Sequence, residues 1–291
     1  MRFEYLEPET IEEALTILNR YQGRSKVIAG GTDLMLQMRN KSIDPEYVVD
    51  ITRIPGLNHI AFDGPQGLRL GALTTIRALE TSVEIQRRAP VLSQAAGQLG
   101  SVAVRNVATL GGNLCNALPS AETSQALVAL SGRVRIAGSK GERIVPLEKF
   151  FTGVGKTVLE PDELLLEILV PGCPPHTSGA YLKHSPRGPI DLAIVNITVL
   201  ITMDPEKKIC RDAKIVLGAV GPTPLRARKA EEMLKGKRID EILIEGAAQM
   251  ASEEAHPRRG SIRGSVEYKK EMVRVLTGRA MKELTVFETE S

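Results

Sequence analysis

Two Gly-Gly pairs are the residues of this sequence whose types and spacing are best suited to holding a charged ligand. Residues 28–34 read IAGGTDL and residues 109–116 read TLGGNLCN, and each pair follows a β-like run and precedes a small polar residue. In an αR–αL turn, which glycine adopts without strain, successive backbone N–H groups converge on one point and bind phosphate oxygens. The two pairs therefore predict two backbone cradles for a diphosphate, although each pair alone is also typical of an ordinary tight turn.

Polar side chains near these pairs would add to such a site. Thr32 and Asp33 follow the first pair, while Thr109 and Asn113 lie on either side of the second. Further along, the stretch YLKHSPRGPIDLAIVN carries Lys183 together with other charges around a turn. It is most simply a hairpin with a charged loop, and a lysine that faces a site between domains is its functional alternative.

No other pattern in the sequence indicates catalytic or metal-binding chemistry. The tripeptide GKT at 155–157 lacks the glycine that a phosphate-binding loop requires five residues before Gly155, where Phe150 stands. There is no GxSxG motif, and the carboxylate pairs fall on the exposed faces of expected helices. The cysteines and histidines have no ligand spacing, so we expect neither a zinc site nor an iron–sulfur cluster on this chain. Isolated cysteines also favour a location in the reducing cytoplasm.

The composition excludes several classes of partner. The chain of 291 residues has 42% apolar and 25% charged side chains and a net charge of +3, which is typical of globular proteins. Aromatic residues make up only 3% and the basic residues are scattered, so we expect no nucleic-acid binding. The longest apolar stretch, 164–170, contains Glu167 and is too short for a bilayer, so we expect no membrane insertion. The N-terminus has no signal-peptide pattern.

The apolar spacing predicts the elements that would position the glycine pairs. Thr10 and Glu13 form a capping box before an apolar helical stripe, so a helix is expected to follow. Short β-like runs at 26–30 and 47–51 complete a small β/α unit over the first 55 residues or so. After a hairpin around DGPQG, we expect helices near 74–86, 90–99 and 120–130 and strands at 133–138 and 164–170.

A stretch rich in proline and glycine, 171–179, is the best candidate for a linker between two domains. Beyond it the pattern changes to three strands joined by turns, which predicts an antiparallel meander followed by helices. We expect these strands within 179–185, 192–203 and 213–220, and the helices near 226–235, 239–254 and 265–284.

Three of these stretches together resemble a known family. AGGTDL, RNVATLGGNLCNALPSAET and YLKHSPRGPIDLAIVN are similar to segments of the FAD-binding (medium) subunit of the molybdenum hydroxylases, a family that includes xanthine dehydrogenase and aerobic CO dehydrogenase. The resemblance runs from Phe3 to about Leu284, and FTGVGKT also resembles a loop of this family. It implies an α+β fold, with a two-subdomain FAD-binding fold of the vanillyl-alcohol oxidase (PCMH) type and a C-terminal domain with a three-stranded antiparallel sheet and helices. The implied domains are 1–175, with subdomains of about 1–55 and 56–175, and 178–291.

The resemblance also implies which residues would contact the FAD. The first glycine segment, 26–33, would wrap the diphosphate, and the second glycine segment, 109–113, would meet it from the other side. Glu122 matches an acidic residue, commonly Asp, that bonds the ribose, Leu165 approaches the flavin region, and Lys183 reaches toward the cofactor. The implied cofactor-binding residues are Lys26, Val27, Ile28, Ala29, Gly30, Gly31, Thr32, Asp33, Thr109, Leu110, Gly111, Gly112, Asn113, Glu122, Leu165 and Lys183. No catalytic residue and no metal ligand is implied on this chain.

The function implied by the resemblance is an electron relay within a cytoplasmic heterotrimer. A large subunit would hold molybdopterin and oxidise a purine or similar substrate, and a small subunit with two [2Fe–2S] clusters would pass electrons to the flavin. The flavin would reduce NAD⁺ or another acceptor. The alternatives are the medium subunit of a CO dehydrogenase or of another heterocycle or aldehyde dehydrogenase, a stand-alone flavin oxidoreductase, and a scaffold without flavin.

Overall fold

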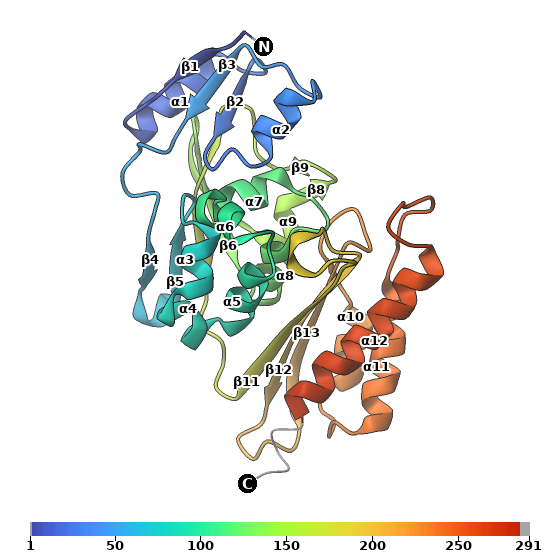
Figure 1. The fold of residues 1–291 in the computed structure, drawn as a ribbon. Helices are drawn as coiled ribbons and strands as arrows, with labels where there is room; N and C mark the ends of the chain where they lie inside the picture. The colour runs from blue at the N-terminus through green and yellow to red at the C-terminus, as the bar shows by residue number, and fades with distance from the viewer. Residues whose placement is uncertain (1, 286–291) are drawn as a thin grey trace.

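The N-terminal part of the chain forms a small three-stranded parallel sheet (Figure 1). The computed structural model describes residues 2–285. Strands β1 and β2 both pair in parallel with β3, and the helices α1 and α2 lie in the connections. These elements are β1 (Glu4–Leu6), α1 (Ile11–Arg20), β2 (Ser25–Ile28), α2 (Leu34–Arg39) and β3 (Tyr47–Asp50). The expected β/α unit is therefore confirmed.

Helix α1 shows why this unit forms. The Thr10 hydroxyl accepts a hydrogen bond from the Glu13 N–H, and the Glu13 carboxylate accepts one from the Glu9 N–H, so that the first turn is capped as the sequence predicts. Ala14 and Leu18 are buried on one face of the helix and pack against the β3 side of the sheet. Burial of this apolar face holds the short helix in place.

The middle of the chain forms a five-stranded antiparallel sheet that small helices cover on one face. The strands, in their order across the sheet, are β4 (Ile60–Phe62), β5 (Leu68–Gly71), β10 (Leu164–Val170), β6 (Arg133–Gly138) and β7 (Gly141–Pro146). The helices are α3 (Ile76–Thr81), α4 (Val83–Arg88), α5 (Pro90–Gly97), α6 (Val102–Val107), α7 (Leu110–Asn116), α8 (Glu122–Ala129) and α9 (Leu147–Phe150). A two-stranded hairpin, β8 (Phe151–Gly153) and β9 (Lys156–Thr157), contains the GKT tripeptide.

One expected helix in this part is divided. The region 74–86 contains two short helices, α3 and α4, rather than one. Ser82 ends the first with an extended backbone and begins the second, because its hydroxyl accepts a hydrogen bond from the Ile85 N–H.

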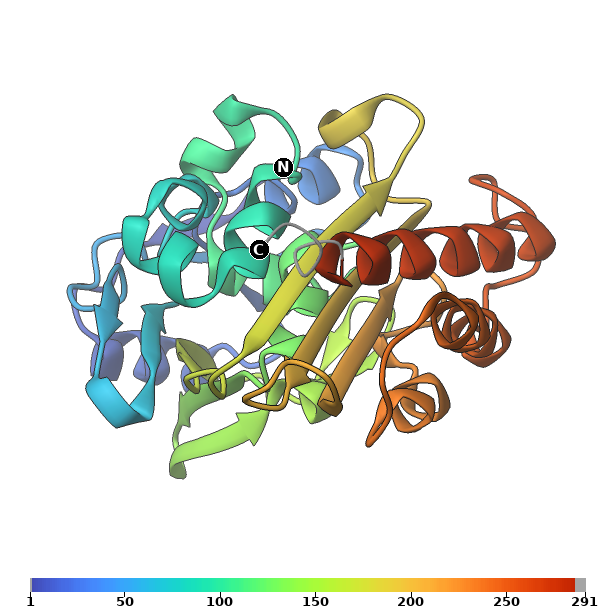
Figure 2. The same cartoon turned by 90° about the horizontal axis from the view of Figure 1, so that it is seen from below.

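The C-terminal part is an antiparallel sheet between two sets of helices (Figure 2). One face packs on α5 and α8, and the other face is covered by α10, α11 and α12. The elements are β11 (Thr177–His184), β12 (Val195–Met203), β13 (Cys210–Gly218), β14 (Leu225–Arg226), α10 (Arg228–Leu234), α11 (Glu241–Glu254) and α12 (Val266–Thr285). The predicted three-stranded meander is confirmed, with β14 as a short fourth strand.

The helices of the described part of the chain are too short or too polar to cross a bilayer.

Candidate functional site

A large pocket lies where the N-terminal sheet meets the middle of the chain. It has a volume of about 580 Å³, and its walls come from segments far apart in the sequence. The first glycine segment and α2 line one side, and α7, the start of α8 and the start of β10 line the other. The pocket therefore brings the two glycine segments to one cavity.

The first glycine segment presents unpaired backbone donors to this pocket. Gly31 has a positive φ of 69°, so the chain turns sharply between β2 and α2. No atom of residues 2–285 accepts a hydrogen bond from the N–H groups of Gly30, Gly31, Thr32 or Asp33. Four successive N–H groups beside a pocket are a suitable donor set for phosphate oxygens.

Gly30 itself is required by packing rather than by a ligand. A Cβ at this position would lie 2.0 Å from the carbonyl oxygen of Val107 and 2.9 Å from the Cα of Ala108. The absence of a side chain therefore lets β2 approach the end of α6 closely.

We predict that Gly30→Ala separates these two segments. Forcing a methyl group into a backbone contact costs about 1–3 kcal/mol of unfolding free energy, because the backbone has to shift. Thermal unfolding should therefore show a lower Tm even without ligand. The control is Gly172→Ala, whose Cβ would lie in open space at an ordinary φ, so the Tm should change little. Gly141→Ala also adds its Cβ in open space, but it is a poorer control because Gly141 has a positive φ. An unchanged Tm in Gly30→Ala would contradict the close approach.

The second glycine segment differs from the expected turn. Gly111 and Gly112 lie in the first turn of α7, because the Thr109 hydroxyl caps this helix by accepting a hydrogen bond from the Gly112 N–H. The Gly111 N–H donates to the carbonyl of Ala72. The prediction of an αR–αL cradle is wrong here, since the N–H groups of this segment already have partners within the protein.

The two glycines of this segment have different surroundings. A Cβ on Gly111 would lie 2.8 Å from the Ala72 carbonyl oxygen, so this glycine lets α7 pack against the end of β5. A Cβ on Gly112 would meet only the Thr109 hydroxyl, at 2.9 Å, and would otherwise project into open space beside the pocket. Gly112 therefore keeps the pocket wall free of a side chain.

The charged residues that line the pocket are one lysine and four acids. Lys26 is the cation, and the acids are Asp33, Glu122, Glu163 and Asp191. Three acids have an ion-pair partner of their own: Glu122 with Lys183, Glu163 with Arg143, and Asp191 with Arg187. Their charges are therefore compensated, so that an anionic ligand meets little net repulsion from them.

Glu122 and Lys183 form a buried pair between α8 and β11. The distance from Lys183 Nζ to Glu122 Oε1 is 2.7 Å, and the side chains are only 1% and 5% exposed. The Lys183 ammonium also donates to the carbonyls of Gln98 and Pro189, at 2.7 and 3.1 Å. Its three hydrogens are thus all used, and it acts on the pocket through Glu122. Burial raises the pKa of Glu122, and Lys183 opposes this rise.

Asp33 belongs to a polar chain that joins the two sides of the pocket. Burial raises its pKa, while hydrogen bonds with Asn116 and Thr32 act in the opposite direction. Gln37 on α2 donates to the Asn116 side chain on α7, at 3.4 Å. The sequence analysis did not identify Gln37 or Asn116, since no motif marks a contact between residues this far apart.

The residues predicted from the sequence line this pocket with two exceptions. Leu110 is fully buried in the core, and Lys183 lies behind Glu122. Asn113 lines the pocket, but its side-chain oxygen accepts a hydrogen bond from the Thr123 hydroxyl. Cys115 lines the pocket as well, where its side chain is exposed.

The residues present fit an FAD molecule. The free N–H groups of the first glycine segment and Lys26 suit a diphosphate, and Glu122 and Asp33 suit sugar hydroxyl groups. Leu73, Leu164 and Leu165 give the pocket an apolar wall for a ring system.

Comparisons with known proteins agree with this fit. Residues 1–173 match the FAD binding domain in molybdopterin dehydrogenase, and residues 180–284 match the CO dehydrogenase flavoprotein C-terminal domain. The chain is 33% identical to the 6-hydroxypseudooxynicotine dehydrogenase complex subunit alpha of Paenarthrobacter nicotinovorans, over 96% of this chain and 93% of that one. It is 28% identical to the xanthine dehydrogenase FAD-binding subunit of Escherichia coli O157:H7, over 96% and 94%.

Solved structures give the same result. A chain of the carbon monoxide dehydrogenase from Hydrogenophaga pseudoflava superposes with a TM-score of 0.92 at 32% identity, covering 97% of this chain and 96% of that one. A chain of quinoline 2-oxidoreductase from Pseudomonas putida 86 superposes with a TM-score of 0.91 at 28% identity, covering 98% and 97%. The chain therefore belongs to the family of FAD-binding medium subunits of the molybdenum hydroxylases, and it carries the FAD-binding domain of that family.

Proposed function

We propose that the large pocket holds the FAD, with its diphosphate between the two glycine segments. The observation that carries this proposal is that residues 26–33 and the second glycine segment apart from Leu110, which are remote in sequence, line the same pocket. The N–H groups of Gly30 to Asp33 would bind the phosphate oxygens, and Gly112 would leave room for them. The remaining predicted residues keep the roles that the resemblance implies, with two exceptions. Lys183 acts by holding Glu122, and Leu110 packs in the core away from the pocket.

The proposed domain division follows from the same arrangement. We assign the FAD-binding domain to 1–175, with subdomains of about 1–55 and 56–175, and the C-terminal domain to 178–291. The three larger sheets and the two matched regions support this division. The part of the last range beyond residue 285 lies outside the described residues.

The chain would act as an electron relay in a cytoplasmic heterotrimer. When bound, FAD accepts electrons from one redox centre and passes them to another. The donors would be two [2Fe–2S] clusters of a small subunit, which receive electrons from a molybdopterin-binding large subunit. Within residues 2–285 no group of three or more His, Cys, Asp or Glu side chains could hold a metal ion. The final acceptor would be NAD⁺ or another oxidant, and the substrate a purine or similar molecule.

A second candidate is supported by the sequence identities. The relatives that act on 6-hydroxypseudooxynicotine and on carbon monoxide are 33% and 32% identical to this chain, compared with 28% for the xanthine dehydrogenase subunit. A complex that oxidises another heterocycle or carbon monoxide is therefore the alternative to a purine hydroxylase.

The first experiment is a visible spectrum of the purified chain, with acid release and chromatography of the bound compound. The proposal would be supported by one equivalent of non-covalent FAD in the purified chain. It would also be supported by molybdenum and iron in the complex obtained by co-expression. A colourless chain that refuses FAD both alone and in the co-expressed complex would overturn it in favour of a scaffold.

Lys26 should contribute a modest, salt-dependent part of the FAD affinity. It is the cation that lines the pocket, but its side chain is exposed, so its attraction to a diphosphate is screened. We expect Lys26→Gln to weaken FAD binding about threefold at low salt and less at high salt, because exposed charge pairs contribute little. Fluorescence titration of FAD at two salt concentrations measures this. Lys41→Gln, an exposed lysine that does not line the pocket, is the control. Equal loss at both salt concentrations would contradict an electrostatic role.

A further inference from the structure

A second pocket lies at the other end of the five-stranded sheet from the large pocket. Its walls come from the β4–β5 hairpin, α4, the start of α5, the linker after β10 and the start of β11. Leu165, near the start of β10, lines the large pocket, whereas Val170 at the end of this strand lines the second one. The volume of about 450 Å³ is large enough for a small organic molecule.

The floor of the second pocket is apolar. Val91 on α5, Val170 on β10 and Leu200 on β12 line it, and each of these side chains is at most 7% exposed. The ring of Phe62 on β4 adds an aromatic surface that is 43% exposed. A ligand with an apolar body would remove these surfaces from water, which favours its binding.

The charged side chains that line the second pocket within residues 2–285 are two neighbouring arginines on α4. The Arg88 Nε donates to Glu84 Oε2 at 2.6 Å, and its guanidinium carbon lies 3.3 Å from the centre of the Phe62 ring. Arg87 is exposed and has no ion pair with the described residues. A hydrogen bond from Arg88 and the charges of both arginines lower the pKa of Glu84, so it is the acid near both. Two arginines and one glutamate leave a net charge of +1 at the edge of the pocket.

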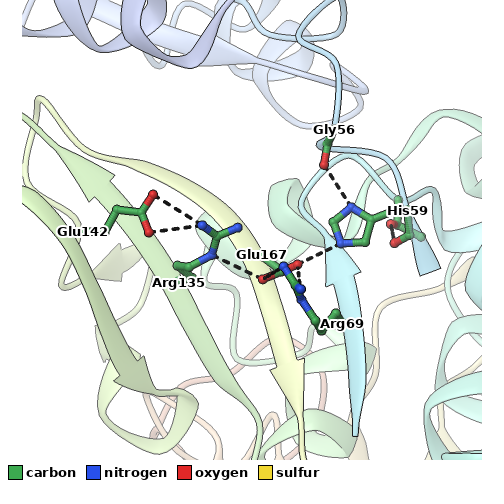
Figure 3. A network of polar contacts seen from close by, with 7 residues as sticks. Gly56, His59, Arg69, Arg135, Glu142 and Glu167 are labelled. Carbon is green, nitrogen blue, oxygen red and sulfur yellow. Dashed lines mark hydrogen bonds and ion pairs between the residues drawn. The ribbon is translucent and has the colours of Figure 1, made fainter. Parts of the chain in front are cut away.

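Arg69 is adjacent in sequence to the pocket-lining Leu68, but it does not add to this charge. Side chains alternate between the two faces of a strand, so Arg69 lies on the face of the sheet opposite to Leu68. There it donates to Glu167 at 3.0 Å, and Glu167 also contacts Arg135 and His59 (Figure 3). The positive charge at the second pocket therefore comes from the two arginines of α4.

We propose that the second pocket is a binding site for a small organic monoanion, such as an aromatic carboxylate. The apolar body lies on Val91, Val170 and Leu200, and the carboxylate lies beside Arg87 at the edge of the pocket. A single negative charge matches the net charge of the arginine group. The site is independent of the FAD assignment, since the two pockets have no lining residue in common.

Two cysteines let the position of a bound ligand be measured. Cys173 on the linker lines the second pocket, Cys115 lines the large pocket, and both are exposed. The full-length chain, freed of FAD, is alkylated by iodoacetamide with and without naphthoate, and each cysteine is followed by mass spectrometry of its peptide. We expect naphthoate at about ten times its dissociation constant to slow alkylation of Cys173 about tenfold, because only the free site reacts. Alkylation of Cys115 should not change.

Charge variants test the role of Arg87, and each is compared with and without the ligand. Arg87→Glu should bind naphthoate about tenfold more weakly, because an attraction at an exposed site becomes a repulsion. Arg87→Gln should bind it about threefold more weakly. Naphthamide, which has no charge, should protect Cys173 equally in the wild type and in both variants. Arg238→Glu reverses an exposed arginine that lines neither pocket and should keep the wild-type affinity.

The outcome at Cys173 decides the proposal. A ligand of this size is expected to bind with a dissociation constant of about 1 mM or below, so about 10 mM naphthoate should fill the site. Protection of Cys173 in the wild type that falls in both Arg87 variants would support the proposal. No protection at this concentration, protection of Cys115 alone, or equal protection of Cys173 in the wild type and the Arg87 variants would overturn it.

Discussion

Gly112→Val is expected to give a folded chain that retains little FAD. Gly112 is the glycine of the second segment whose Cβ would project beside the pocket rather than into protein backbone. A valine there would place two methyl groups in space that the proposed diphosphate occupies, and it would crowd the Thr109 hydroxyl. Overpacking of this size costs about 1–3 kcal/mol, so FAD affinity should fall by roughly five- to 150-fold.

The measurement combines flavin content with thermal unfolding of the flavin-free chain. Gly112→Ala should lie between the wild type and Gly112→Val in FAD affinity, because its single methyl group fills less of the pocket. Gly278→Val makes the same change in α12, where a Cβ meets only Ala248 at 3.8 Å, and it should leave the flavin content unchanged. Full flavin content in a folded Gly112→Val chain would place the diphosphate elsewhere.

Lys183→Met is expected to be the most destabilising of the changes considered. It removes the counter-charge from Glu122, which is 4% exposed, and leaves a carboxylate buried without a partner. Breaking a buried pair in this way costs about 3–5 kcal/mol of unfolding free energy. Urea unfolding measures this loss. Lys208→Met removes a lysine from an exposed pair with Glu206 and should change the unfolding free energy little.

The pH dependence of Lys183→Met gives an independent check. Burial already raises the pKa of Glu122, and the loss of Lys183 removes a group that lowers it. The folded variant therefore binds a proton on Glu122 at a pH where the unfolded chain does not, so its stability should increase as the pH falls toward the unfolded value of about 4.3. Adding Glu122→Gln should recover part of the lost stability at neutral pH. No recovery in the double variant would show that the loss comes from packing alone.

Local signals made much of the fold predictable. The capping box at Thr10 and the strands of the C-terminal sheet depend on residues close in sequence, and the corresponding elements are confirmed. The division at Ser82 was missed because a serine in a helical stretch has the same pattern whether it faces solvent or caps a new helix.

The site was predictable where a motif is continuous and not where it depends on contacts across the fold. The turn at the first glycine segment is predicted by its own residues. The second segment is a helix, but its Gly-Gly pair predicts a turn because two glycines are compatible with either structure. The sequence showed Glu167 as a charge within an apolar strand. Its partners His59 and Arg69 lie 108 and 98 residues away, so their contact could be found only in the structure.

The link between Lys183 and Glu122 has a consequence for the biosynthesis of the protein. During translation the N-terminal part emerges from the ribosome first and begins to fold before β11 exists. At that stage the pocket wall formed by α8 contains a carboxylate whose counter-charge has not yet been synthesised. The pocket wall therefore reaches its final charge balance only after β11 has been made and has docked against α8.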